Sequence, residues 1–198
     1  MIVGLINPRK AEAVFDGYTN KEESESKILR NVFREGQNAY NSGDLLRFDE
    51  ENCFSFVDRT GDTFRWRGEN VSTTEVEAAI SGQIKFKTVA VYGVEINSLE
   101  GKAGMAAILD PEKQLDLKFL ADGLKKTLPS YARPLFLRVI GNFNFTGTFK
   151  LNKTNLRADG FNPALIKDPL YFIDLQTGEY RPLTQEAYDN IQNGKMRL

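Results

Sequence analysis

The sequence predicts an α+β protein with a β-rich first part, residues 1–58, and a small α+β domain over residues 59–198. Two observations support this class. From residue 63 to residue 140, patterns typical of strands and helices follow one another as strand–helix–strand–strand–helix–strand. Residues 58–62 place a charged pair before Gly61, which is typical of a flexible joint, although a hairpin turn would explain the same residues. We expect a central, mostly antiparallel, three-stranded sheet with flanking helices in the second part.

The first part carries signals for a strand, a helix and a hairpin. Residues 1–6 form an apolar run closed by a turn signal, so we expect a short buried strand there. Thr19 and Glu22 have the spacing of a capping box, and the apolar stripe behind them predicts a helix over about residues 20–34. Two apolar runs surround a polar reversal at residues 49–52, a pattern typical of a β-hairpin.

The second part has clearer start and stop signals. Ser72 and Glu75 form a capping box, which predicts a helix that starts at Ser72. A second amphipathic helix begins near Leu117 and is stopped by Pro129. The expected strands are residues 86–94, 104–109, 135–140 and 170–173, and a last helix is expected after Thr184.

The composition excludes several kinds of site. The chain has 198 residues, a formal net charge of −1 and no histidine, so it carries no Ser-His-Asp triad and no His-bearing metal site. Cys53 is the only cysteine, which excludes an internal disulfide and a thiolate metal cage. We expect no metal site in this chain and, without bulk basicity, no nucleic-acid partner. No apolar run is long enough to span a bilayer, and the start lacks the layout of a signal peptide.

Two clusters in the first part offer groups for a ligand. Asp44 lies in the turn 41–44, just before a strand, and an ionised carboxylate can accept hydrogen bonds from a pair of ligand hydroxyls. An Asx turn explains the same residues through main-chain chemistry alone. Arg59, within residues 58–62, has a planar guanidinium suited to phosphate or carboxylate, and a surface ion pair is the alternative.

Two further clusters lie in the second part. Gly68, in the run 68–70, removes a side chain where a main chain or a slim ligand must pass closely, and a loop shaped only to start the next helix is the alternative. Lys150 ends a glycine- and hydroxyl-containing turn at residues 143–150 and could bring an ammonium group to a phosphate or carboxylate. A hairpin with a solvated lysine explains that turn as well, and its alternating phenylalanines mimic an RNA-binding strand only weakly.

The order and spacing of these clusters carry more information than each cluster alone. The motifs are Ser42-Gly43-Asp44, the run from Asp58-Arg59 through Gly68-Glu69-Asn70-Val71, Leu128-Pro129-Ser130, Thr146-Gly147-Thr148-Phe149-Lys150 and Gly160-Phe161-Asn162-Pro163. Together they resemble the adenylate-forming enzymes, which include acyl-CoA synthetases, luciferases and peptide-synthetase adenylation domains. The combination covers essentially the whole chain and is most similar to the very-long-chain acyl-CoA synthetase and fatty-acid transport protein branch.

The resemblance implies a role for each cluster. It places Lys150 at the catalytic position, where a compact positive charge bridges carboxylate and α-phosphate oxygens. It places Asp44 at the ribose hydroxyls of the adenylate and Arg59 beside the ribose and phosphate. The implied hinge consists of Gly61 and Asp62. The loop that lines the pantetheine passage in the thioester-forming state corresponds to Arg67, Gly68, Glu69 and Asn70.

The resemblance also implies that much of the enzyme is absent from this sequence. The ATP phosphate loop, the acyl tunnel and the magnesium-binding glutamate of these enzymes lie in a large N-terminal domain, and none of their motifs occurs here. Residues 1–58 look like the end of that domain, and residues 59–198 look like the mobile C-terminal domain. We therefore expect a C-terminal fragment of an ATP-dependent long- or very-long-chain fatty-acid:CoA ligase. Its parent would use ATP, Mg²⁺ and coenzyme A, none of them bound tightly by this chain.

By itself the chain is expected to be inactive, because it has no ATP or acyl pocket to which Lys150 could be delivered. Its partner would be the missing adenylation domain, and unpaired strand edges in residues 1–58 would favour a homodimer or strand exchange. The alternative is a non-enzymatic module that docks on a separately encoded N-terminal half or binds coenzyme A. A cytoplasmic location is expected, and it is compatible with membrane association of the parent.

Overall fold

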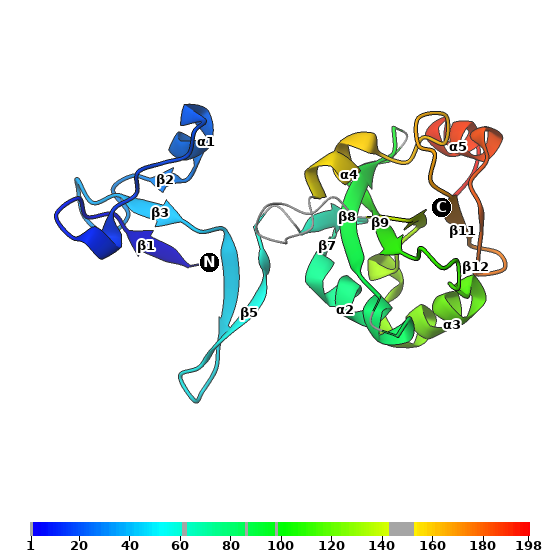
Figure 1. Ribbon diagram of the computed structural model, residues 1–198, viewed down its shortest axis with the longest axis horizontal. Helices are drawn as coiled ribbons and strands as arrows, with labels where there is room; N and C mark the ends of the chain where they lie inside the picture. The colour runs from blue at the N-terminus through cyan, green and yellow to red at the C-terminus, as the bar shows by residue number, and fades with distance from the viewer. Residues whose placement is uncertain (1, 61–62, 86, 98, 143–152) are drawn as a thin grey trace. The chain divides into compact units, whose positions relative to one another are not determined.

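The computed structural model describes residues 2–60, 63–85, 87–97, 99–142 and 153–198 (Figure 1). The chain separates into two compact units, Met1–Gly61 and Asp62–Leu198, each with a sheet of its own. The domain boundary after residue 58 and the hinge at Gly61 and Asp62 stay predictions, because Gly61 and Asp62 lie outside the described residues.

The first unit consists of short strands, one short helix and very little core. Three strands form an antiparallel sheet in the order β1-β3-β2, and β4 and β5 form a separate antiparallel hairpin. This hairpin confirms the reversal predicted at residues 49–52. The elements are β1 (Val3–Leu5), η1 (Ala11–Ala13), α1 (Lys21–Ser26), β2 (Ile28–Leu29), β3 (Ala39–Asn41), β4 (Asp44–Phe48) and β5 (Phe54–Arg59).

The helix predicted over residues 20–34 is wrong in its length. Helix α1 has only six residues, and Asn20, not Thr19, is its N-cap. The Asn20 side-chain oxygen accepts from the main-chain N–H groups two and three residues later, at 2.9 and 3.4 Å. Ile28 and Leu29, which suggested a longer helix, instead pair with β3 as strand β2. Asn31 then adopts a left-handed φ of 54°, which is incompatible with a continuing right-handed helix.

Apolar side chains of the first unit remain largely exposed. The strand predicted at residues 1–6 forms as β1, but it is not buried, since Ile2 and Leu5 are 45% and 49% exposed. Phe33, which was expected on the apolar stripe of the helix, is 65% exposed. Ala39 is the only buried apolar residue among the described residues of this unit. So small a unit does not cover its own apolar surface.

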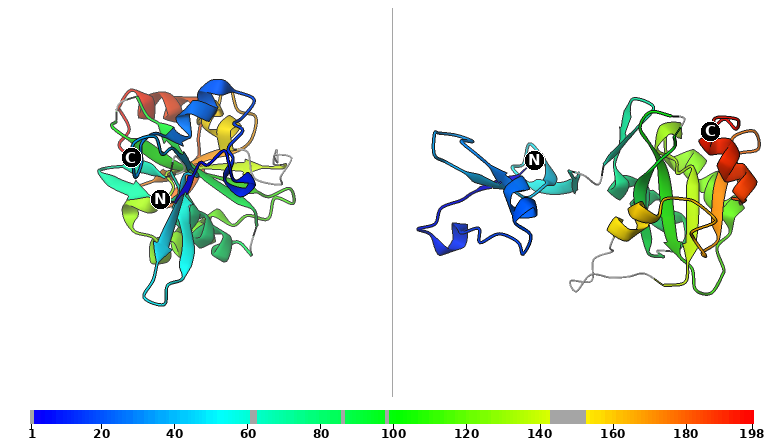
Figure 2. Two further views of the ribbon diagram at one scale, coloured as in Figure 1. Left: turned by 90° about the vertical axis from the view of Figure 1, so that its left-hand side faces the viewer. Right: turned by 90° about the horizontal axis from the view of Figure 1, so that it is seen from above.

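The second unit is built around a five-stranded sheet in the order β12-β11-β10-β9-β8. Its elements are β6 (Phe64–Trp66), β7 (Glu69–Val71), α2 (Thr73–Gln83), β8 (Val89–Glu95), β9 (Lys102–Leu109), α3 (Leu117–Thr127), η2 (Ser130–Ala132), β10 (Phe136–Ile140), α4 (Lys153–Asp159), β11 (Leu170–Asp174), β12 (Glu179–Pro182) and α5 (Gln185–Gln192). Helices α2 and α3 lie on one side of the sheet, and α4 and α5 on the other (Figures 1 and 2).

The sheet confirms the predicted α+β class and its mostly antiparallel character. Only β9 and β10 are parallel, because helix α3 connects them as a crossover. The sheet has five strands rather than three, since the tail strands β11 and β12 join its edge beside β10. The Ser72 hydroxyl accepts from the main-chain N–H of Glu75 at 3.3 Å, which confirms the predicted start of α2. None of the described helices is both long and apolar enough to cross a membrane.

Two of the seven tyrosines should resist ionisation in the folded protein. Burial raises the pKa of Tyr92 and of Tyr180 far above the ordinary value of 10.0, and nearby Arg138 and Arg133 offset only part of that rise. The Tyr180 hydroxyl donates to the main-chain oxygen of Pro134 at 2.7 Å. The Tyr92 hydroxyl has no hydrogen-bond partner among the described residues.

Because both pKa values are raised in the folded state, both phenols contribute stability that is complete below pH about 10 and lost as the pH rises further. In an alkaline absorbance titration, the phenols of Tyr92 and Tyr180 should therefore ionise only as the fold is lost. Tyr180→Phe should leave one resistant phenol. Simultaneous ionisation of all the tyrosines with the circular dichroism unchanged would contradict this prediction.

Candidate functional site

Asp44 begins strand β4 directly after a tight polar turn. Asn41 Oδ1 accepts from the main-chain N–H of Gly43 at 2.9 Å, and the Ser42 hydroxyl accepts from that of Asp44 at 3.1 Å. The Asx turn that was the alternative explanation for this cluster is therefore present, but Asn41 makes it. Asp44 is not needed as the Asx residue. It is half-buried at a fixed point of the β4–β5 hairpin.

The main chains of Asp44 and Arg59 are direct neighbours across this hairpin. Arg59 ends β5, and the antiparallel register pairs it with Asp44, next to an irregularity between Leu45 and Leu46. The Thr60 N–H also donates to the main-chain oxygen of Gly43. The fold thus brings together two positions that are 15 residues apart in the chain and were expected to contact the same nucleotide.

The four residues expected to line a pantetheine passage lie in the β6–β7 hairpin, Arg67 and Gly68 in its turn and Glu69 and Asn70 in β7. Trp66 pairs with Glu69 across the turn, so its two central residues are Arg67 and Gly68, with φ angles of 51° and 86°. Positive φ at both positions defines a type I′ turn. A side chain at Gly68 would meet nothing within 4 Å, so the glycine is explained by its backbone angle and leaves open space at the tip of the turn.

Glycines in the neighbouring strands fix the position of this hairpin. A Cβ at Gly93 would lie 2.9 Å from Phe64 Cβ, and one at Gly104 would lie 3.2 Å from Phe64 Cζ. Phe64 therefore packs against β8 and β9 in space that is free only because residues 93 and 104 are glycines. Gly101 approaches the hairpin so closely that an added Cβ would lie 2.5 Å from the Arg65 carbonyl oxygen. Gly93 and Gly104 lie inside β8 and β9, where a glycine in a strand pattern is a signal for close backbone approach, but neither was predicted to have this role.

The Arg67 side chain connects the turn to the far end of the described chain. Its guanidinium lies 5.5 Å from the centre of the Trp66 ring and donates a hydrogen bond to the main-chain oxygen of Leu198. The Leu198 side chain is buried beside a cavity of about 190 Å³. No sequence pattern signalled this contact, because it joins residues 131 positions apart.

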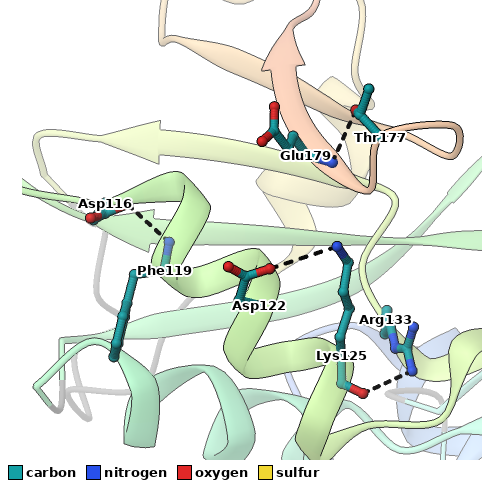
Figure 3. A network of polar contacts seen from close by, with 7 residues as sticks. All are labelled: Asp116, Phe119, Asp122, Lys125, Arg133, Thr177 and Glu179. Atoms are coloured by element: carbon teal, nitrogen blue, oxygen red, sulfur yellow. Dashed lines mark hydrogen bonds and ion pairs between the residues drawn. The ribbon is translucent and has the colours of Figure 1, made fainter.

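The same cavity has cationic residues on its walls and no aspartate or glutamate among the described residues that line it. Besides Arg67, they are Lys125 and Arg133. Figure 3 shows their contacts: Arg133 donates to the main-chain oxygen of Lys125 at 3.1 Å, and Lys125 Nζ lies 3.7 Å from the Asp122 carboxylate. Arg133 also donates to the oxygen of Leu128 at 2.9 Å, so its guanidinium fixes the end of α3.

The remaining predicted site residues have no described side chain. Lys150 lies outside the described residues, between the end of β10 and the start of α4. The Arg59 side chain is likewise not described. In the described part of the chain, cysteine and acidic side chains do not gather into a group that could hold a metal ion.

Sequence comparison relates the whole chain to one group of proteins. Long-chain fatty acid transport protein 1 of Mus musculus is 50% identical over 198 residues, which are 100% of this chain and 31% of that protein. The Homo sapiens protein of the same name is 48% identical with the same coverage. The chain is a relative of the long-chain fatty acid transport proteins. It spans about a third of the length of these relatives. No protein-family model matches it.

Solved structures share the fold of most of this chain. The ATP-bound MatB protein of Rhodopseudomonas palustris matches with a TM-score of 0.60 and 23% identity, over 75% of this chain and 29% of that one. The o-succinylbenzoate CoA synthetase of Bacillus subtilis, in complex with its acyl-adenylate intermediate, matches with a TM-score of 0.58 and 25% identity, over 73% and 28%. The predicted likeness to the C-terminal portion of adenylate-forming ligases is thereby confirmed.

Proposed function

We propose that this chain is the C-terminal portion of an ATP-dependent long- or very-long-chain fatty-acid:CoA ligase and that the isolated chain makes no acyl-CoA. The observation that carries the proposal is the 50% identity to a fatty acid transport protein along the whole chain, over only 31% of that relative. In the first half-reaction the fatty carboxylate attacks the α-phosphate of ATP and releases pyrophosphate. In the second, the thiol of coenzyme A attacks the acyl carbon and AMP leaves.

The proposed roles need charge and position rather than a covalent protein nucleophile. Lys150 would neutralise charge between the carboxylate and the α-phosphate in the first half-reaction. Asp44 would accept from the ribose hydroxyls, with Arg59 beside it, and the pairing of these two positions in one hairpin supports a shared ligand. Residues 67–70 of the β6–β7 hairpin would face the pantetheine arm in the second half-reaction. Mg²⁺ held by the rest of the parent would supply further neutralisation of phosphate charge.

The proposed partner is the remaining two thirds of the parent protein. The number of exposed large apolar side chains in this small unit supports such docking, because burying them against a partner is favourable. A cytoplasmic location, with membrane association of the parent, is part of the proposal. The side chains that would be covered are between 44% and 67% exposed, and they are Ile2, Leu5, Val14, Tyr18, Phe33, Phe48, Phe54 and Phe56.

A chimera tests the proposal. This chain would replace the matching 198 residues of the mouse fatty acid transport protein, and acyl-CoA formation would be assayed with ATP, Mg²⁺, coenzyme A and a long-chain fatty acid. The chimera should be active, and both the isolated chain and the mouse protein lacking the matching segment should be inactive. Acyl-CoA formed by the isolated chain, or a folded chimera that forms none, would refute the proposal.

The exposed apolar surface also favours a second candidate, a binding module without activity of its own. Such a module would dock on a separately encoded N-terminal half or bind coenzyme A, which a calorimetric titration of the isolated chain would detect.

The same surface supports the self-association expected for residues 1–58. Light scattering decides that point, since a monomer at high concentration would rule out a homodimer or strand exchange.

A further inference from the structure

The walls of the 190 Å³ cavity in the second unit are mostly hydrocarbon. Trp66 of β6 and both Ala121 and Leu124 of α3 are buried side chains that line it. Tyr180 lines it as well, but its hydroxyl already donates to the main-chain oxygen of Pro134. A group that entered the cavity would therefore meet mainly apolar surface, which favours an apolar group.

The positive charges on these walls lack strong anionic partners. The described hydrogen bonds of Arg67 and Arg133 go to main-chain oxygens, so neither guanidinium has a carboxylate partner among the described residues. Lys125 Nζ lies 3.7 Å from the Asp122 carboxylate, and both side chains are about half exposed, so that pair is weak (Figure 3). Gly178 makes room for this ammonium, since a Cβ there would lie 2.5 Å from Nζ. The three cations are therefore suited to an anion.

Leu198 shows that the cavity can hold an apolar group next to an oxygen. Its side chain is only 4% exposed and borders the cavity, and its main-chain oxygen accepts a hydrogen bond from Arg67. The Arg67 guanidinium lies 5.5 Å from the centre of the Trp66 ring, which helps to fix it beside the apolar wall. A planar guanidinium in this position is well shaped for a carboxylate that is attached to a hydrocarbon chain.

We propose that this cavity binds a short aliphatic carboxylate. The hydrocarbon chain would fill the apolar interior, and the carboxylate would lie among Arg67, Lys125 and Arg133. A water molecule takes up about 30 Å³ in the liquid, so a cavity of about 190 Å³ has room for a chain of about six carbon atoms. The inference does not depend on the proposed function, because binding at this site requires no turnover.

Hexanoate is the probe, and Trp66 is the reporter. Trp66 is the single tryptophan and lines the cavity. Titration of the isolated chain with sodium hexanoate at constant ionic strength should therefore change its fluorescence in a saturable way. Acetate carries the charge without the chain, and hexanol carries the chain without the charge. Each should bind at least about tenfold more weakly than hexanoate, because each loses one of the two kinds of contact.

Three variants separate the contributions of charge and shape. Lys125→Met removes the ammonium and should raise the dissociation constant of hexanoate about fivefold. Ala121→Leu keeps all three cations but fills part of the cavity, and it should weaken binding at least about tenfold. Lys126→Met removes the charge of an exposed lysine that does not line the cavity, and it should bind hexanoate like the wild type.

Three results would overturn the inference. They are a fluorescence titration without saturation, equal affinity for hexanoate and either acetate or hexanol, and equal weakening by Lys125→Met and Lys126→Met. Circular dichroism checks that each variant is folded. If Ala121→Leu does not fold, the comparison of the two lysine variants and of the three ligands still decides the question.

Discussion

Lys150→Ala in the chimera should lower the rate of acyl-adenylate formation by about a hundredfold or more. Removing one preorganised charge or donor that stabilises a transition state typically costs about 10²–10³ in rate. Lysine suits the task because its ammonium is compact and can face oxygens of two groups at once. The measurement is pyrophosphate release in a single turnover, with enzyme in excess over fatty acid.

The second half-reaction provides the internal control for this variant. When acyl-adenylate is supplied directly, Lys150→Ala should form acyl-CoA at a nearly normal rate, because adenylation chemistry is bypassed. Lys126→Ala is the matched variant, since Lys126 is an exposed lysine in the last turn of α3. Equal losses in both half-reactions, or an equal loss in Lys126→Ala, would show that Lys150 is not the adenylation lysine.

Much of the second unit was predictable because its signals are local. Ser72 and Glu75 mark the start of α2 within one helical turn, and apolar runs of strand length mark β8, β9 and β10. The size of the sheet was not predictable in the same way. Strands β11 and β12 join it through pairings with distant residues, which no local pattern specifies. Local sequence patterns therefore predict the individual strands but not the number of strands that pair in one sheet.

The wrong length of the helix predicted over residues 20–34 has a different physical origin. The apolar residues after α1 fit a helical stripe, yet main-chain pairing with β3 outweighs that weak preference, and Asn31 turns the chain away. The roles of the site residues came from the family resemblance rather than from their local patterns. Contacts that span the fold, such as Arg67 with Leu198 or Lys153 with Glu77, had no sequence signal at all.

The two units also differ in what holds them together. Nearly all buried apolar side chains among the described residues belong to the second unit, which also contains partly buried ion pairs such as that of Lys87 with Asp110. The first unit has exposed phenylalanines and little core, so burial of apolar surface stabilises it less. Stability measured on the isolated chain should therefore report mainly on the second unit. Trp66, the single tryptophan and a buried residue of that unit, provides the fluorescence signal.

Lys87→Met should lower the free energy of unfolding of the second unit by about 3 kcal/mol at neutral pH, because it leaves a buried carboxylate without its ion-pair partner. Asp110 is only 3% exposed, its Oδ1 pairs with Lys87 Nζ, and its Oδ2 accepts from the Leu115 main-chain N–H at 2.8 Å. Burial alone would raise the pKa of Asp110, but the hydrogen bonds from Lys87 and Leu115 outweigh it and hold the pKa below 3.8. Urea unfolding followed by Trp66 fluorescence measures the loss, with Lys118→Met on exposed α3 surface as the control.

The pH dependence of this stability loss shows whether it comes from an unpaired buried charge or from lost packing of the lysine side chain. In the wild type, the lowered pKa of Asp110 means that its stabilisation is complete above pH about 4 and lost as the pH falls through the folded pKa. In Lys87→Met, the hydrogen bond and charge of Lys87 no longer lower that pKa, so Asp110 protonates at a higher pH than in the wild type and the difference from wild type should shrink as the pH falls. Lys87→Met combined with Asp110→Asn should be more stable at neutral pH than Lys87→Met alone, because no charge remains buried. A double variant no more stable than the single one, with a gap independent of pH, would mean that the lysine stem and not its charge supports the fold.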